Sequence, residues 1–134
     1  MPEIFLTSRQ LEVLRLRRKG LSQREIASKL KTTRENVNIL EMRAHRNIRK
    51  AAATLEVLSK LEIAATLKIP PKTPILRIPL LILKKADEAN IRVKMNCIEI
   101  LREVQLKAEG KIRKKRLLKP LTVIILPDGS LHIR

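Results

Sequence analysis

Residues 23–42 carry the pattern that most constrains how this chain can fold. The stretch QREIASKLKTTRENVNILEM places apolar side chains where two short helices that cross at a tight turn must touch. These contact positions are Ile26, Ala27, Leu30, Val37 and Leu40. Ala27 lies where only a small side chain lets the helices approach each other. The spacing predicts a helix-turn-helix, a motif typical of proteins that bind double-stranded DNA.

Two capping boxes predict where the first two helices of this region begin. Thr7 and Gln10 are three residues apart, as are Ser22 and Glu25, and each pair can satisfy free backbone N–H groups at a helix start. One helix should therefore begin directly after Thr7 and another directly after Ser22. Gly20 is a suitable stop for the first, because glycine readily takes the left-handed conformation that ends helices.

The turn between the second and third predicted helices departs from the usual pattern at one position. Most such motifs have glycine first in the turn, because the backbone there is left-handed, and this chain has Lys31. A residue with a side chain costs roughly 1–2 kcal/mol in that conformation. Thr33 is the expected N-cap of the third helix. The inward stripe of that helix should be Val37, Leu40, Ala44 and Ile48.

The face of the third helix opposite this stripe mixes hydrogen-bonding groups with apolar ones. An arginine can make a bidentate contact to guanine, an asparagine can do so to adenine, and a glutamate can accept from the cytosine amino group. Exposed isoleucine and methionine would suit thymine methyl groups, or they would pack on another part of the protein. The predicted base-contacting residues of helix 34–50 are Arg34, Glu35, Asn38, Ile39 and Met42.

Cations and helix N-termini around this face are expected to contact phosphate groups. Arginines further along the third helix lie where a helix leaves the groove. The starts of the second and third helices offer backbone N–H groups to an anion. The alternative for the charged side chains is a solvated surface. The predicted phosphate contacts of this region are Ser22, Gln23, Arg24, Thr32, Thr33, Arg43, Arg46, Arg49 and Lys50.

Beyond residue 52 the pattern changes to short strands that alternate with helices. The third helix either continues as a long connector or breaks and resumes before Leu61. Strands are predicted over residues 61–69 and 91–95. A cluster of prolines after the first of them marks a loop.

Two further helices are predicted in this half. Pro79 suits the first position of one, because the missing N–H of proline is not needed there, and Asn90 is a left-handed stop after it. Asn96 and Glu99 form a third capping box for the other helix, which should end at Gly110.

The last segment, LTVIILPDGSLHIR, predicts a hairpin that turns at residues 127–129. Together the patterns predict an α+β chain with an N-terminal all-helical helix-turn-helix domain over residues 1–52. A small C-terminal α/β domain should follow over residues 53–134, on a sheet of about three or four strands.

Residues 111–116, KIRKKR, form the densest run of charge in the chain. No asparagine or glutamine is interleaved, so the run can add affinity for phosphate but little sequence information. Its alternative is a solvated loop. The predicted phosphate contacts of this run are Arg113, Lys114, Lys115 and Arg116.

Residues 5–50 resemble the fourth region of bacterial sigma factors and the related LuxR-type domains. The stretches that carry this resemblance are FLTSRQLEVLRLRRKGLSQREIASKL and TTRENVNILEMRAHRNI. The chain is more similar still to archaeal Tfx-type transcriptional regulators, because IPPKTPILRIPLLILKKADEANIRV and KIRKKRLLKPLTVIIL resemble that family's second domain. In sigma-type domains the start of the third helix contacts bases, which implies this role for Arg34 and Glu35. Many sigma domains have a polar residue where this chain has Ile39, so the recognised sequence should differ.

Composition limits the class of partner. The net charge of +17 favours a polyanion. Phe5 is the sole aromatic residue, which weakens an RNA or single-strand hypothesis because those proteins usually stack bases on aromatic rings. Cys97 is the sole cysteine and can form no internal disulfide, as expected in the reducing cytoplasm. No apolar run approaches the ~18 residues of a membrane span.

No pattern of catalytic residues or of a cofactor site is found, and His45 and His132 lie far apart, so neither a cofactor nor a metal site is expected.

The sequence favours a transcriptional regulator that binds double-stranded DNA sequence-specifically through the major groove. Expected partners are a second copy, held through the helix around Leu80–Leu83, and the transcription machinery. One alternative is a nucleoid-type or RNA-associated protein that neutralises phosphate without sequence readout. Another is an enzyme whose site lies in the second domain.

Overall fold

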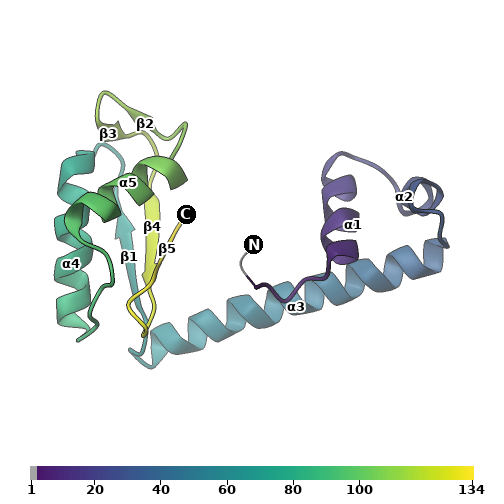
Figure 1. Cartoon of the computed structure of the whole chain (residues 1–134), viewed down its shortest axis with the longest axis horizontal. Helices are drawn as coiled ribbons and strands as arrows, with labels where there is room; N and C mark the ends of the chain where they lie inside the picture. The colour runs from purple at the N-terminus through teal and green to yellow at the C-terminus, as the bar shows by residue number, and fades with distance from the viewer. Residues whose placement is uncertain (1–2) are drawn as a thin grey trace. The chain divides into compact units, whose positions relative to one another are not determined.

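The computed structural model describes residues 3–134, and the chain divides into two compact units (Figure 1), one ending at Thr54 and the other beginning at Leu55. The first unit is helical and the second combines helices with antiparallel strands, so the predicted α+β fold class is confirmed. The division into domains of residues 1–52 and 53–134 stays a prediction.

The first unit is made of helices whose starts are set by local capping. Both predicted capping boxes are present, Thr7 with Gln10 and Ser22 with Glu25. In each box the N-cap hydroxyl accepts from a backbone N–H, and the longer side chain accepts from the N-cap N–H in return. The helices are α1 (Ser8–Arg18), α2 (Gln23–Leu30) and the first part of α3 (Arg34–Lys60).

A small hydrophobic core joins these helices. All the contact positions expected from the helix-turn-helix spacing lie in it: four are buried and Leu40 is partly buried. Ala27 is only 6% exposed, as the close approach of α2 and α3 requires. The buried residues of this core are Val13, Leu16, Ile26, Ala27, Leu30 and Val37.

The inward stripe of α3 ends earlier than expected. Ala44 is fully buried, but Ile48 is 43% exposed, so the expectation that Ile48 points inward was wrong. The hydrophobic core of this unit includes no side chain of α3 beyond Leu40, and among the described residues past Ala44 only the Asn47 side chain bonds back, to the carbonyl of Phe5. Of the two alternatives for the end of α3, the continuous connector is found, since the helix runs unbroken to Lys60.

The turn between α2 and α3 has the left-handed residue that the sequence indicates. Lys31 has φ of 55° and ψ of 48°. Its N–H donates to the carbonyl oxygens of Ala27 and Ser28, and the N–H of Thr32 donates to Ala27 as well. These bonds satisfy the last carbonyl groups of α2 and compensate for the conformation that glycine would take more easily.

The second unit begins with the end of α3 and continues with short elements. Its helices are α4 (Ile78–Glu88), preceded by the 3-10 turn η1 (Ile75–Arg77), and α5 (Cys97–Lys107). Its strands are β1 (Ala65–Ile69), β2 (Ile112–Arg113), β3 (Arg116–Leu117), β4 (Leu121–Ile125) and β5 (Leu131–Ile133).

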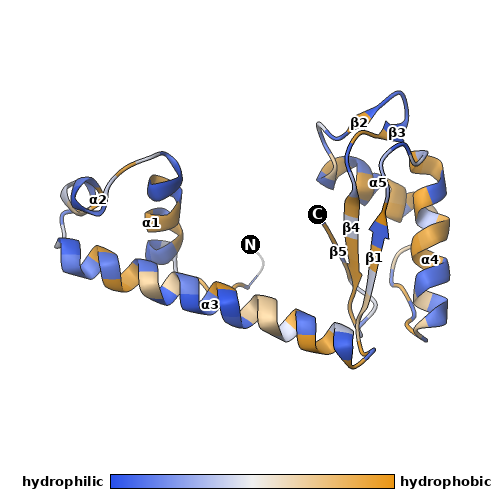
Figure 2. Cartoon of the chain, turned by 180° about the vertical axis from the view of Figure 1, so that it is seen from behind, coloured by the Kyte–Doolittle hydropathy of each residue, from blue (hydrophilic) through white to orange (hydrophobic). Residues whose placement is uncertain are grey.

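A three-stranded antiparallel sheet with the order β1-β4-β5 forms the centre of this unit. Val123 pairs with Leu67 on one side and with Ile133 on the other, so these side chains share one face. That face packs against α4 and α5 in one hydrophobic core. Figure 2 shows β4 and β5 as largely hydrophobic strands, which agrees with their place in the core.

Three sequence-based boundaries in this unit were wrong. Residues 61–64 are a turn and not strand, because their N–H groups bond back to the end of α3 with Glu62 in a left-handed conformation. Residues 91–95 form no strand, since their one backbone hydrogen bond to the sheet region joins the N–H of Lys94 to the carbonyl of Gly129. Helix α5 ends at Lys107, short of Gly110.

Other local signals in this unit are confirmed. Pro79 is the second residue of α4 and not the first, which still places it in the first turn, and Asn90 has φ of 56° after that helix. Asn96 and Glu99 form the third capping box. Residues 112–117 form the two-stranded hairpin β2–β3 and not a loop, while residues 113–116 are exposed; contact of their cations with phosphate stays a prediction.

The turn between β4 and β5 is also as predicted, and it is held by several polar contacts. The N–H of Gly129 donates to Leu126, and the carboxylate of Asp128 accepts from the hydroxyl and the N–H of Ser130. These bonds from Ser130 lower the pKa of Asp128. Within residues 3–134, no helix is both long enough and apolar enough to cross a membrane.

The glycines of this unit allow a matched test of the turn. Gly129 has φ of 86°, and a Cβ there would clash with the carbonyl oxygen of Arg92. Gly110 has φ of 80° with open space around it. Gly129→Ala should therefore lower the free energy of unfolding by roughly 2–4 kcal/mol through strain and overlap, and Gly110→Ala by about 1–2 kcal/mol through strain alone. Urea titration followed by far-UV circular dichroism suits a chain without Trp or Tyr. Equal losses would contradict the packing of Arg92 on the turn.

Candidate nucleic-acid interface

The start of α3 is built by two threonines and one asparagine. The Thr33 hydroxyl oxygen accepts from the N–H of Asn36 at 3.1 Å, which confirms Thr33 as the N-cap. The Asn36 side chain in turn donates to the Thr32 hydroxyl at 3.0 Å. Both hydroxyl oxygens therefore act in the cap, but each hydroxyl still has its proton to donate to a phosphate oxygen.

The predicted base-contacting side chains are all exposed on α3. Ile39 is 44% exposed and Met42 is 57% exposed, so these apolar groups are not drawn into the core of their unit. A shallow hollow at the start of the helix is lined by Arg34, Glu35, Asn38 and Ile39. The structure thus brings together four of the five residues proposed from the sequence, and Met42 lies one turn beyond Asn38.

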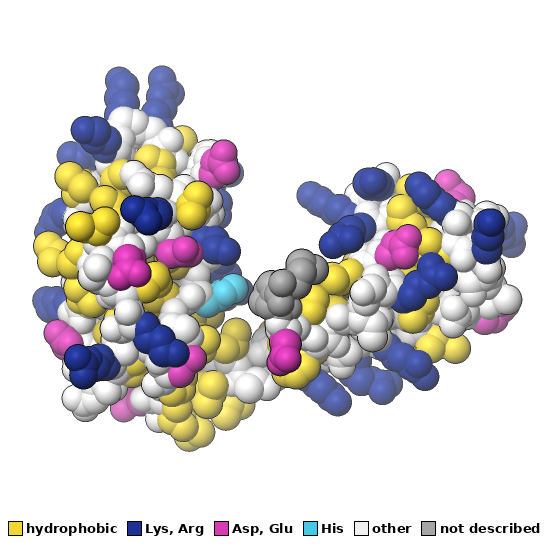
Figure 3. Space-filling view, in the orientation of Figure 1, with side chains coloured by type: hydrophobic (Ala, Val, Ile, Leu, Met, Phe, Trp, Pro, Cys, Tyr) yellow, Lys and Arg dark blue, Asp and Glu magenta, His cyan; other side chains and the backbone are white. Residues whose placement is uncertain are grey.

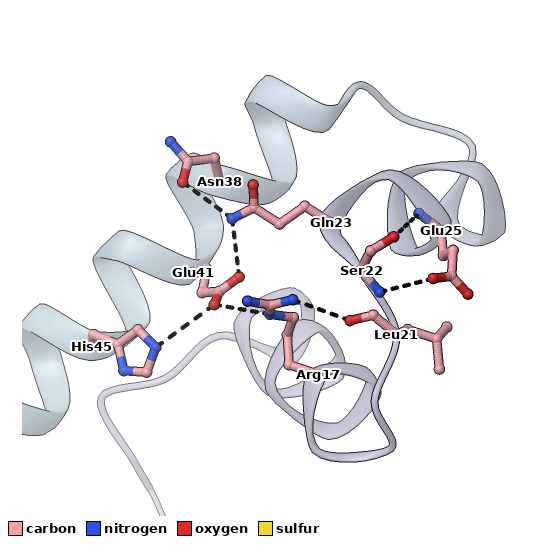
Figure 4. A network of polar contacts seen from close by, with 8 residues as sticks. All are labelled: Arg17, Leu21, Ser22, Gln23, Glu25, Asn38, Glu41 and His45. Carbon is pink, nitrogen blue, oxygen red and sulfur yellow. Dashed lines mark hydrogen bonds and ion pairs between the residues drawn. The ribbon is translucent and has the colours of Figure 1, made fainter.

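Asn38 is oriented by contacts within the protein. Its carbonyl oxygen accepts from the amide nitrogen of Gln23 at 3.1 Å, and its own amide nitrogen lies 3.6 Å from the sulfur of Met42. Figure 4 shows this amide nitrogen turned away from Gln23. A bidentate contact to adenine needs both ends of the amide, and the carbonyl oxygen keeps a second lone pair for it.

A second shallow hollow lies at the start of α2. It is lined by three arginines, one serine and one glutamine: Arg17, Ser22, Gln23, Arg24 and Arg34. The capping box uses the N–H groups of Ser22 and Glu25, which leaves those of the first helical residues directed outward. Guanidinium groups next to a helix N-terminus are suited to bind a phosphate.

Glu41 joins the three helices of this unit and was missed by the sequence analysis. Its carboxylate accepts from Arg17 of α1 at 3.1 Å and from Gln23 of α2 at 3.2 Å, and His45 lies at 3.9 Å (Figure 4). The side chain is only 14% exposed. A sequence signal did exist, because Glu41 falls between Val37 and Ala44 on the inward side of α3, where a carboxylate needs partners.

Arg17 is a further residue that the sequence analysis did not include. It lines the hollow at the start of α2, and besides its bond to Glu41 it donates to the carbonyl of Leu21 at 3.2 Å. Its guanidinium is thereby held in place at the edge of the proposed phosphate site.

The cations of α3 that are proposed to contact phosphate are free of acidic partners within residues 3–134. Figure 3 shows dark-blue Lys and Arg side chains over this unit with few Asp and Glu between them. The cations concerned are Arg43, Arg46, Arg49 and Lys50.

The remaining proposed phosphate contacts lie in the other unit. Arg113, Lys114, Lys115 and Arg116 are exposed residues of the β2–β3 hairpin. In residues 3–134 no group of three or more His, Cys, Asp and Glu side chains is placed to hold a metal ion.

Comparison with known families decides what kind of protein carries this surface. Residues 51–133 match the family model described as the C-terminal part of the DNA-binding protein TFX. The chain belongs to the Tfx family. This match covers the second unit, so it is separate from the geometry of the helix-turn-helix.

Whole-chain relatives extend the Tfx assignment to the first unit. A protein of Methanocaldococcus jannaschii, provisionally named a transcriptional regulatory protein, is 39% identical over 96% of this chain and 94% of its own length. The DNA-binding protein Tfx of Methanothermobacter thermautotrophicus is 30% identical over 96% of this chain and 94% of its own length. A similarly named regulator of Methanococcus vannielii is 34% identical over 98% of this chain and 92% of its own length. Membership of this DNA-binding family argues against the enzyme hypothesis.

The contacts of Glu41 predict a clear difference between two glutamates of α3. Glu41→Gln keeps the shape but removes the charge that Arg17 and Gln23 bond to, and should lower the free energy of unfolding by about 1–2 kcal/mol. Glu56 pairs with Lys60 at 3.5 Å on an exposed surface, so Glu56→Gln should change it by less than ~0.5 kcal/mol. Thermal unfolding by circular dichroism gives both values, and similar effects would show that Glu41 does not hold the helices together.

Proposed function

We propose that this Tfx-family protein is a transcriptional regulator that binds double-stranded DNA sequence-specifically, with the first part of α3 in the major groove. The observation that carries the proposal is the grouping of Arg34, Glu35, Asn38 and Ile39 in one exposed hollow at the helix start. The names of the relatives support DNA as the ligand and transcription as the process.

The two hollows of the first unit suggest a division of roles. Side chains at the start of α3 include donors, acceptors and apolar groups, which is the mixture that base edges in the major groove require. The hollow at the start of α2 has arginines and free N–H groups, which suit the adjacent phosphates. The cations from Arg43 to Lys50 would meet phosphates where α3 leaves the groove.

This composition favours sequence readout over simple charge neutralisation. A nucleoid-type surface would gain from cations throughout, yet Glu35 lines the proposed site and would be repelled by phosphate. Ile39 and Met42 are exposed there without any benefit for binding phosphate. An RNA-associated role is less favoured, because Phe5 is the one aromatic side chain for stacking.

Three variants test base contact against phosphate contact. Arg34→Ala, Glu35→Ala and Asn38→Ala should weaken binding to a duplex selected from random sequences far more than to random duplexes. A bidentate contact to a base is worth roughly 1–3 kcal/mol of discrimination, or a factor of about 5 to 150. Arg46→Ala, the matched control on the same helix, should weaken binding to both duplexes by the same factor.

Fluorescence anisotropy with labelled duplexes at fixed salt measures both affinities. A wild-type preference of ~10³ or more for the selected duplex is expected of a regulator. A wild-type ratio near one would support the nucleoid-type alternative. Equal losses on both duplexes for the three α3 variants would remove the base-contact proposal.

We also propose that the protein acts as a homo-oligomer, because pairing two small helix-turn-helix units on one duplex raises affinity without new contacts. The surface expected at Leu80–Leu83 needs correction. Ile82 is fully buried, and Leu81 and Leu83 pack against the core, so only Leu80 faces outward. Leu76 lies four residues earlier, and the two leucines are 66% and 64% exposed. Contact with the transcription machinery stays a prediction.

Removal of this leucine pair tests the oligomer. Leu76→Ser with Leu80→Ser should shift the protein to a smaller species in sedimentation velocity at micromolar concentration, because less apolar area would be buried between the copies. Ile98 and Leu106 on α5 are exposed to a similar degree and provide a matched double-serine control. A wild-type monomer that binds singly to an asymmetric site would contradict the proposal.

A further inference from the structure

The hairpin β2–β3 has a turn of unusual composition. Ile112 pairs with Leu117 and Arg113 pairs with Arg116, so that Lys114 and Lys115 form the two-residue turn. Their φ angles are 52° and 61°. Two left-handed residues in succession define the type I′ turn, for which Asn-Gly is strongly preferred. Here two lysines occupy both positions.

One face of the hairpin holds it in the core of the second unit. Leu117 is 1% exposed, and Ile112 packs against the same hydrophobic core. The neighbouring loop adds backbone bonds: Lys72 donates its N–H to Leu117 at 2.7 Å, and Ile75 donates to Lys115 at 2.9 Å. The tip is therefore supported on a rigid base and is not a loose loop.

The opposite face carries cations with little compensation. Arg113 and Arg116 are directly opposite each other, and like charges in that arrangement destabilise a strand pair. Arg116 donates to the carbonyl of Lys72 at 2.9 Å, whereas the side chains of Arg113, Lys114 and Lys115 have no hydrogen bond or ion pair among residues 3–134. Figure 3 shows Lys or Arg side chains that project at the end of the unit where Figure 1 places β2 and β3.

We propose that residues 112–117 form a preformed phosphate-binding finger, which gives the protein a second, sequence-independent contact to the DNA backbone. Repulsion between like charges and an unfavourable turn composition are local costs, and such costs concentrate at functional sites. A phosphate backbone would relieve the repulsion. The tip of the hairpin consists of two lysines, whose ammonium groups act as point charges without the planar fork of arginine, so its contribution should depend little on sequence. This inference rests on DNA being the ligand, as in the proposed function.

A variant with a more favourable turn sequence and fewer charges separates an effect on DNA binding from an effect on folding. Lys114→Asn with Lys115→Gly gives the preferred type I′ composition and two fewer charges. In the full-length protein, the midpoint of thermal unfolding should stay the same or rise. Affinity for selected and random duplexes should fall by the same factor. The slope of log affinity against log salt should become less negative by about 0.9 for each phosphate that the variant no longer binds, or about 1.8 if each lysine binds one phosphate.

Two control variants separate the effect of the hairpin on DNA binding from the effect of the protein's net charge. Lys84→Gln with Lys107→Gln removes the same charge from exposed helix positions and should leave the salt slope near that of the wild type. Lys114→Arg with Lys115→Arg keeps the charge and should keep the slope.

The inference is overturned if the Asn-Gly variant binds duplexes with wild-type affinity and slope, or if the Lys84 and Lys107 variant loses as much. It is also overturned if the Asn-Gly variant loses binding to anionic phospholipid vesicles but not to DNA. A different result would contradict the proposed function: the wild-type protein would show no preference for the selected duplex. The salt slope on random duplexes still tests the hairpin in that case.

Discussion

The small hydrophobic core that joins α1, α2 and α3, with Ala27 buried in it, is the constraint on which the proposed DNA-facing surface depends. The methyl side chain lies in the core, and the carbonyl oxygen of the same residue accepts bonds from the turn that follows. A larger side chain would separate the helices, and interiors packed at crystal-like density do not absorb such a change freely. Ala27 thus contributes both to the core that joins the helices and to the hydrogen bonds of the turn that precedes α3.

Electrostatics impose the second constraint on the molecule. With a net charge of +17, the cationic side chains of the protein repel one another, and the fewer acidic side chains could neutralise some of them. In the first unit, the largely buried Glu41 instead bonds to Arg17 and Gln23 and joins the helices. Most exposed cations of α3 and of the β2–β3 hairpin are left without acidic partners. An unsatisfied cationic surface of this kind is costly in the free protein and is relieved by a polyanion.

The second unit depends on a different physical principle, the pairing of distant strands. β1 and β5 both pair with β4, which brings residues far apart in sequence into one ladder. Such ladders satisfy backbone groups only for segments that meet a partner in register. Residues 91–95 have an apolar and polar alternation suited to a strand, but Lys94 makes a single backbone hydrogen bond to the β4–β5 turn, besides its ion pair with Asp128, and no ladder forms.

The sequence by itself determined the features that depend on neighbours within a few residues. The three capping boxes, the left-handed Lys31 and Asn90, and the turn at residues 127–129 all involve groups close together in the chain, and all are found. The inward stripe of α3 was also predictable through Ala44, because helical periodicity alone places those side chains. Exposure of the proposed base-contacting residues follows from the same periodicity.

Only the tertiary structure decided the features that join distant segments. Arg17 and Glu41 are 24 residues apart, and Gln23 and Asn38 are 15 residues apart, so no local pattern could pair them. The exposure of Ile48 depends on where the hydrophobic core of the first unit ends along α3. The run at residues 111–116 became a hairpin because Leu117 is buried and residues 72–75 supply backbone partners. Local propensity alone would not place two lysines in a type I′ turn, and packing of the flanking residues overrides it.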